Sequence, residues 1–176
     1  MRFSDTLRYW AIPKVKEAAL LDESWLDSWL ERFEEVYPAL PTQIVHRDPN
    51  PDNLYVADGS VVGFADFDLS RILPRTFDLA YAATGLLSDT FDRLDPQTRE
   101  GFFTAAGAIW RGYHAASALT REECQTLADM VIAIELICVA AFSGSDRFAH
   151  ALEMNRQMLA VVLEGETRLR QAAQWM

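Results

Sequence analysis

The chain has 176 residues, the usual size of one domain, and half of its residues are apolar, which is enough for a sizeable core. Its formal net charge of −10 argues against binding nucleic acid or an anionic membrane surface, because both attract basic patches. No signal peptide opens the chain, and the longest nearly apolar run, 130–142, contains a glutamate and is too short to cross a bilayer, so we expect a soluble cytoplasmic protein.

The first third of the chain predicts a helix that begins after Asp22, a residue suited to cap it, and ends before Pro38. Trp25, Trp29 and Phe33 lie four residues apart and therefore share one face of this helix. An aromatic stripe of this kind serves either as a ligand platform or as core packing, and the general frequency of apolar helix faces favours the core.

The only convincing β region follows. Three short stretches have the composition of strands: 43–45, 54–56 and 61–65. Asp58-Gly59 between the last two predicts a hairpin turn. The hairpin places Asn53 at the start of one strand and Asp66 at the end of its partner, so these two oxygen-bearing side chains become neighbours.

The loop before this hairpin carries the most informative motif. His46 to Asn53 has the pattern H-x-D-x-x-x-x-N, which is typical of the catalytic loop of kinase-type phosphotransferases. Phosphoryl transfer needs a carboxylate beside the acceptor hydroxyl and oxygen ligands that hold Mg²⁺ on the nucleotide phosphates. Asp48, Asn53 and Asp66 supply these groups from one small patch.

The rest of the chain is helical. Four apolar periodic stretches predict helices: 79–87, 97–118, 121–142 and about 146–171. Thr120 and Glu123 form a capping-box pattern at the start of the third helix, and Ser143–Ser145 separates it from the fourth. The fold class is therefore α+β and mostly helical, with one small hairpin. We expect a single domain over 1–176, divided into 1–42 (helix and linker), 43–71 (motif loop and hairpin) and 72–176 (helical part).

This arrangement resembles the C-terminal lobe of the aminoglycoside phosphotransferase and choline kinase superfamily, which shares the protein-kinase-like fold. The resemblance rests on the H-x-D-x-x-x-x-N motif, on Asp66-Phe67-Asp68, on Phe77-Asp78-Leu79-Ala80 and on the stretch 134–144. Homoserine-kinase-like and other small-molecule kinases are nearer than protein kinases. Asn50 stands where protein kinases typically carry Lys, and Asp68 stands where their D-F-G motif ends in Gly.

The resemblance implies an ATP- and Mg²⁺-dependent kinase whose partner is a small-molecule hydroxyl acceptor, such as an aminoglycoside, homoserine, choline or a similar metabolite. In the catalytic set, Asp48 would orient the acceptor hydroxyl, His46 would support the loop by hydrogen bonds, and Arg47, often Gly in aminoglycoside kinases, belongs to the same loop.

The resemblance also assigns the groups around the nucleotide. Asn53 and Asp66 would bind Mg²⁺ and, through it, the nucleotide. Asp68 would assist the metal or lie just behind it. Asp78 resembles a position that buttresses the catalytic loop.

Complete members of this superfamily also carry an N-terminal lobe with a strand Lys that contacts the nucleotide phosphates. We find no such lobe before the motif, and the first forty residues resemble the segment just after the interlobe hinge. The alternative function is therefore a catalytically incomplete remnant that acts as a binding or dimerisation module. In that case an oligomer or a partner would cover the apolar surface that the N-terminal lobe otherwise covers.

Several charged residues have no place in the motif. Glu135 interrupts an apolar helix, and we expect it to face solvent more often than to line an acceptor pocket. Glu123 is one of several acids that could attract a cationic substrate, and we expect it to be solvated instead. Arg75 either contacts phosphate or forms an ion pair. Cys124 and Cys138 form no C-x-x-C pair, so we expect reduced thiols in or near the core.

Overall fold

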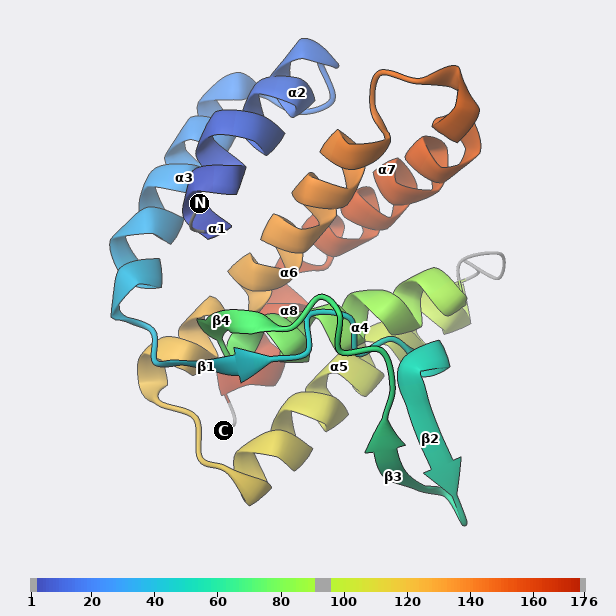
Figure 1. Ribbon diagram of the computed structural model, residues 1–176. Helices are drawn as coiled ribbons and strands as arrows, with labels where there is room; N and C mark the ends of the chain where they lie inside the picture. Colours follow the sequence, from blue (N-terminus) through green and yellow to red (C-terminus); the bar gives the residue numbers. More distant parts are fainter. Residues whose placement is uncertain (1–2, 91–95, 175–176) are drawn as a thin grey trace.

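The computed structural model describes residues 3–90 and 96–174 as a mostly helical fold with two small antiparallel sheets (Figure 1). The helical elements are α1 (Phe3–Thr6), η1 (Leu7–Ala11), α2 (Ile12–Glu17), α3 (Glu23–Val36), η2 (Tyr37–Ala39), η3 (Pro51–Asn53), α4 (Thr76–Asp89), α5 (Pro96–Ala116), α6 (Arg121–Phe142), η5 (Asp146–Phe148), α7 (Ala149–Glu164) and α8 (Glu166–Gln174). The strands are β1 (Thr42–Val45), β2 (Leu54–Ala57), β3 (Ser60–Phe64) and β4 (Arg71–Pro74).

The predicted helix after Asp22 is α3, and its N-terminus is capped as expected, with the Asp22 carboxylate accepting the Trp25 amide at 2.8 Å. Trp29 and Phe33 are buried and stack at 5.3 Å between ring centroids, so the aromatic stripe belongs to the core. The chain before it differs from the expected helix and linker. A further helical segment, α1–η1–α2, packs on α6 and buries Leu7 and Val15 completely.

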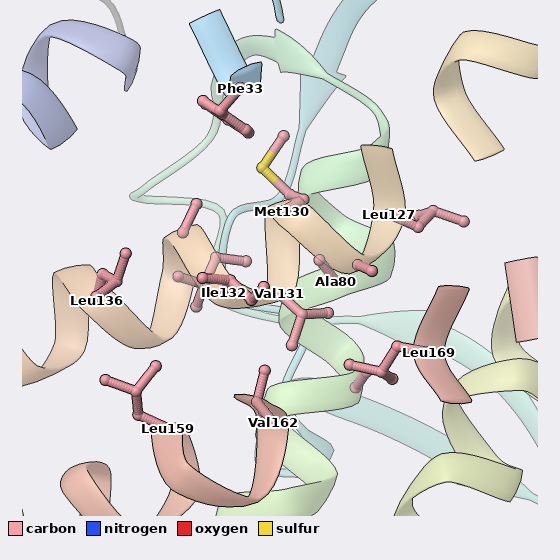
Figure 2. Packing of buried hydrophobic residues seen from close by; sticks show 14 of the residues in the cluster. Phe33, Ala80, Leu127, Met130, Val131, Ile132, Leu136, Leu159, Val162 and Leu169 are labelled. Carbon is pink, nitrogen blue, oxygen red and sulfur yellow. The ribbon is translucent and has the colours of Figure 1, made fainter. Parts of the chain in front are cut away.

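Helix α6 forms the centre of the core and packs on α4, α7 and α8 (Figure 2). Its Leu127, Met130 and Leu136 are fully buried, and Val162 of α7 and Leu169 of α8 meet them. Among the described residues, α6 is the one helix long and apolar enough to cross a membrane by length and composition. Yet 67% of its apolar window is buried inside the fold, which is the burial of a core helix.

The predicted hairpin is present as β2 and β3, with Leu54 opposite Phe64, and it projects away from the helices (Figure 1). Its turn uses left-handed backbone at Asp58 (φ 50°) and Gly59 (φ 74°). A second sheet, which the sequence did not predict, pairs β1 with β4, with Gln43 opposite Leu73. This sheet returns the chain past the start of the motif loop.

The last predicted helix, 146–171, is interrupted in the structure. A short 3₁₀ turn precedes α7, which ends at Glu164, and Gly165 separates it from α8. A side chain at Gly165 would collide with the ring of Phe103 in α5, so close helix packing accounts for the glycine here.

Candidate active site

The motif loop between β1 and β2 is fixed to the first turn of α4 by one carboxylate. Asp78 accepts the backbone amide of His46 at 2.7 Å and that of Arg47 at 2.8 Å. Arg47 has left-handed backbone (φ 74°), which is uncommon for a residue with a long side chain. The two hydrogen bonds to Asp78 therefore help to hold Arg47 in this uncommon backbone conformation.

His46 connects the loop to the end of β3. Its ring is buried, Nε2 lies 2.7 Å from the Ala65 carbonyl oxygen, and Nδ1 accepts the Asp48 amide at 3.3 Å. This pair of partners assigns the proton to Nε2, because a carbonyl can only accept and an amide can only donate. The Phe67 ring packs on His46 at 4.7 Å between centroids. His46 thus holds both Asp48 and the segment that leads to Asp66.

The Asp48 carboxylate is oriented by two amide side chains. Oδ1 accepts from Asn50 Nδ2 at 2.8 Å, and Oδ2 accepts from Asn53 Nδ2 at 3.0 Å. Asn53 Nδ2 also donates to the Asp48 backbone oxygen at 2.9 Å. Nearby, burial and then the charge of Asp48 raise the pKa of Tyr81 in α4. Asp48 is half-buried, so its remaining lone pairs face a partly open space.

Asn53 and Asp66 both lie at the base of the hairpin. The Ala65 amide donates to the Asn53 carbonyl at 2.9 Å, which extends the β2–β3 pairing by one step and brings Asp66 directly after it. Asp66 has left-handed backbone (φ 58°), is exposed, and accepts the Asp68 amide at 3.4 Å. Since Asn53 turns its NH₂ to Asp48, its Oδ1 remains available as an acceptor.

The available oxygens suit Mg²⁺, which is held in phosphoryl-transfer sites by one or two protein ligands plus water and phosphate oxygens. Asn53 and Asp66 offer one amide oxygen and one carboxylate, with Asp68 two residues further on. Over the described ranges 3–90 and 96–174, no group of three or more His, Cys, Asp or Glu side chains could hold a metal ion on its own.

Arg47 does not pair with a carboxylate in any contact that the structure gives. Its Nη1 donates to the Leu69 carbonyl at 3.3 Å, and its guanidinium lies 6.0 Å from the Phe77 ring centroid. Its Nε is buried and has no hydrogen-bond partner within the described residues. Arg47 therefore connects the motif loop to the segment between Asp66 and β4.

A pocket of about 320 Å³ opens beside the loop, between α4, α6 and α7. Residues of the motif loop and of these helices line it: Asn50, Pro51, Asp52, Tyr81, Thr84, Gly85, Ser88, Asp89, Glu135, Cys138, Phe142, Met154, Asn155 and Met158. Asn50 and Tyr81 belong both to the pocket and to the surroundings of Asp48. A larger hollow of about 890 Å³ is lined by α3, α6 and α8 residues and includes none from the motif loop or the hairpin.

Glu135 of α6 was expected to face solvent, and that expectation was wrong. The residue is 1% exposed, lines the pocket, and neither carboxyl oxygen has a hydrogen-bond partner among the described residues. Loss of hydration raises its pKa from 4.5 to about 8. Cys138, one helical turn further on, has its pKa raised to about 12 by burial and then by the Glu135 charge. Both cysteines are free.

Glu123 was also expected to be solvated, but it is fully buried in an ion pair with Arg75. The guanidinium donates through Nε at 2.6 Å and Nη2 at 2.7 Å, and the Thr120 amide donates at 2.7 Å to complete the predicted capping box. Although burial raises the pKa of Glu123, the bonds from Arg75 and Thr120 outweigh it and lower the pKa. Arg75 is therefore an ion-pair residue that joins the start of α4 to α6.

The structure brings the residues named from the motif into one patch and adds two that were not named as members of it. Asn50 was noted only for its difference from protein kinases, yet it holds Asp48. Tyr81 lies one helical turn after Asp78, and that spacing is the only signal in the sequence that places it on the same face of α4.

Comparison with known proteins agrees with this geometry. Residues 2–119 match the model of the phosphotransferase enzyme family. The chain is similar to the homoserine kinase of Zymomonas mobilis subsp. mobilis, with 32% identity over 97 residues, which is 53% of this chain and 28% of that kinase. The chain therefore matches well under half the length of this relative. No solved structure matches the chain.

Proposed function

Because the chain belongs to the phosphotransferase enzyme family, we propose that it is the catalytic lobe of a kinase that uses ATP and Mg²⁺ to phosphorylate a hydroxyl of a small metabolite. Aminoglycosides, homoserine and choline are candidate acceptors. The observation that carries the proposal is the position of Asp48, held by Asn50 and Asn53 beside a pocket, with Asp66 at the adjoining base of the hairpin.

Asp48 is assigned to the acceptor hydroxyl. Each carboxylate oxygen accepts one amide N–H, which leaves further lone pairs for the hydroxyl proton. Its contribution is orientation of the attacking oxygen more than removal of the proton, because phosphoryl transfer depends mainly on positioning. General-base groups in such positions contribute about 10²–10⁴-fold to rate.

Asn53 and Asp66 are assigned to the metal, with Asp68 as a supporting carboxylate. When bound, Mg²⁺ neutralises charge on the transferred phosphate. Asn53 also donates to Asp48, so one side chain fixes the separation between the metal-binding oxygen and the acceptor-orienting carboxylate. This coupling supports placing both functions in one site.

His46, Arg47 and Asp78 are assigned to support. Asp78 holds the two loop amides, His46 bonds both Asp48 and Ala65, and Arg47 bonds Leu69. Phosphoryl transfer depends mainly on positioning, so these contacts belong to the mechanism even though they reach neither phosphate nor acceptor.

The test compares Asp48→Ala with a matched control, Asp58→Asn, at the exposed hairpin turn where left-handed backbone tolerates Asn. Transfer from Mg-ATP to a set of small alcohols should fall by about 10²–10⁴-fold in Asp48→Ala, while Mg-nucleotide binding stays within about twofold. The control should match the wild type in both. Equal loss of transfer and nucleotide binding would contradict the role assigned to Asp48.

The second candidate function is a binding or dimerisation module, and the exposed apolar surface of the two sheets favours it. Ile44 and Ile72 are 75% and 70% exposed, and Tyr55, Val56 and Val62 are more than 60% exposed. Contiguous patches of this kind usually meet another surface. Light scattering of the 19.9 kDa chain tests this candidate, since a strictly monomeric chain contradicts self-association.

A further inference from the structure

The larger hollow, between α3, α6 and α8, carries an excess of basic side chains. Three arginines line it against two carboxylates: Arg32, Arg121 and Arg170 against Asp129 and Glu166. The pocket beside the motif loop has the opposite charge, because three carboxyl groups line it and no Lys, Arg or His among the described residues does. On a chain with a net charge of −10, the hollow is a place where an anion is attracted locally.

Both carboxylates of the hollow already have partners within it. Arg170 donates to the two oxygens of Asp129 at 2.7 and 3.0 Å and to Glu166 at 2.8 Å. The Trp29 indole also donates to Asp129, at 3.0 Å. The two acids are therefore engaged by Arg170, and the positive charge of the other two arginines stays uncompensated.

Arg32 and Arg121 are the two arginines of the hollow without a carboxylate. Neither forms an ion pair or a side-chain hydrogen bond with another described residue. Arg121 is the first residue of α6, where the positive end of the helix dipole disfavours a cation and favours an anion. Of the acids in that turn, Glu123 is paired with Arg75 and Glu122 does not line the hollow. An anion beside Arg121 would therefore meet both the guanidinium and the helix end.

We infer that this hollow is a second ligand site, which binds a small phosphate ester through Arg32 and Arg121. A phosphate monoester carries about −1.5 to −2 charge at pH 7, and two unpaired guanidinium groups match that charge. The planar guanidinium also binds phosphate oxygens in pairs, so arginine suits this group. The inference goes beyond the proposed function and does not rest on it.

The size and the walls of the hollow provide for the organic part of the ester. Its volume of about 890 Å³ lies near the upper end of the range of about 300–1,000 Å³ that is usual for ligand sites, and it exceeds what a phosphate alone needs. Val36, Leu119 and Ala173 supply apolar surface, and Gln125 and Gln174 add amide groups. A ligand with a ring or a short chain beside its phosphate therefore has surface to cover.

The hollow is separate from the candidate active site. None of its lining residues belongs to the motif loop, to the hairpin or to the pocket beside them. Helix α6 reaches both places, with 124–129 at the hollow and 135–142 at the pocket. In Figure 1, α3 lies on the left of the view and the hairpin at the lower right. A phosphate ester bound here would therefore be a ligand other than the donor and the acceptor of the proposed reaction.

Isothermal titration calorimetry of the full chain, without Mg²⁺, tests the inference with three probes. Phenyl phosphate carries a ring and a dianion, benzoate carries a ring and a single charge, and inorganic phosphate carries no ring. Phenyl phosphate should bind at least tenfold tighter than either of the others. Equal binding of inorganic phosphate would overturn the assignment of an organic ligand, and equal binding of benzoate would overturn that of a phosphate. No binding of phenyl phosphate at millimolar concentration would overturn the whole inference.

Substitutions assign the binding to the two arginines. Arg32→Gln and Arg121→Gln should each weaken phenyl phosphate binding by about tenfold, because each removes one charged hydrogen-bond donor. The control, Arg156→Gln, removes the same charge from an exposed arginine of α7 outside the hollow and should bind as the wild type does. All three arginines are exposed, so each variant should keep the wild-type thermal midpoint. Equal loss in all three variants, or no loss in the first two, would contradict the site.

Amide chemical shifts locate the bound probe. Phenyl phosphate should shift the amides of α3, of α8 and of the first turns of α6. Shifts confined to the motif loop and the hairpin would place the probe at the candidate active site and overturn the inference. No arm of this experiment measures phosphoryl transfer, so a failure here leaves the proposed function standing, and a failure of transfer leaves this site standing.

Discussion

Replacing Glu135 by Gln should change how the stability of the empty protein depends on pH. The folded-state pKa of this carboxyl is about 8, above its ordinary 4.5. Between these values the folded chain keeps a proton that the unfolded chain releases, so the free energy of unfolding of the wild type falls as pH rises. The favourable contribution is complete below pH 4.5 and is lost by about pH 8. Gln does not titrate, so the variant lacks this loss.

The expected size follows from the pKa shift. Each pH unit within the window costs about 1.4 kcal/mol, so the wild type loses about 3 kcal/mol relative to the variant by pH 7 and about 5 kcal/mol above pH 8. The other titratable groups that line the pocket are Asp52, Asp89, Tyr81 and Cys138. They are present in both proteins. The pKa of Cys138, raised to about 12, keeps that thiol out of the window.

Urea unfolding at pH 5, 6, 7 and 8 measures the effect. The unfolding free energy of Glu135→Gln minus that of the wild type should widen by about 3 kcal/mol between pH 5 and pH 7. The same difference for Glu122→Gln should stay flat, because that carboxyl is exposed. A constant difference between Glu135→Gln and the wild type across the series would refute the account of Glu135 as a desolvated acid.

Three further substitutions test other parts of the structure. Arg75→Ala leaves the buried carboxylate of Glu123 unpaired and should lower the free energy of unfolding in urea by about 3–5 kcal/mol. Arg99→Ala, at an exposed ion pair, should lower it by about 1 kcal/mol or less, and similar losses in both variants would contradict the argument from burial. Asp78→Ala should speed hydrogen exchange at the two loop amides it binds, and unchanged protection would remove its supporting role. Gly165→Ala should lower the thermal midpoint, with a loss of about 1–3 kcal/mol, and an unchanged midpoint would show that α5 and α8 can separate without cost.

The features that could be predicted from the sequence are local. The turn at Asp58-Gly59 needs left-handed backbone that these residues adopt readily, so the hairpin could be predicted; the one-residue register shift at Tyr55/Val56, which sets Asn53 opposite Ala65, could not. The capping box at Thr120 and the cap at Asp22 follow from side chains that bond amides three residues away. These interactions are complete within a few residues, so a pattern in the chain suffices to find them.

The features that could not be predicted depend on distant segments. Strand β4 is short and ends in proline, and only its pairing with β1, about thirty residues earlier, makes it a strand. Glu123 lies in the polar first turn of α6 and Glu135 in its apolar middle, yet the first is paired with Arg75, 48 residues away, and the second is unpaired. Whether a charged side chain on an apolar helix finds a partner depends on the segments that pack against it, and the periodicity of the helix does not reveal these.

The contacts around Asp48 suggest that acceptor binding and phosphoryl transfer can be separated in this chain. His46 and Asp48 are held by bonds within the motif loop and to Ala65, Tyr81 of α4 lies against Asp48, and the pocket beside them is lined by α4, α6 and α7. The sheets, by contrast, expose an apolar surface next to the proposed metal ligands, so nucleotide positioning depends on whatever covers it. We accordingly expect the loop around Asp48 to keep its shape in this chain whether or not transfer is measurable.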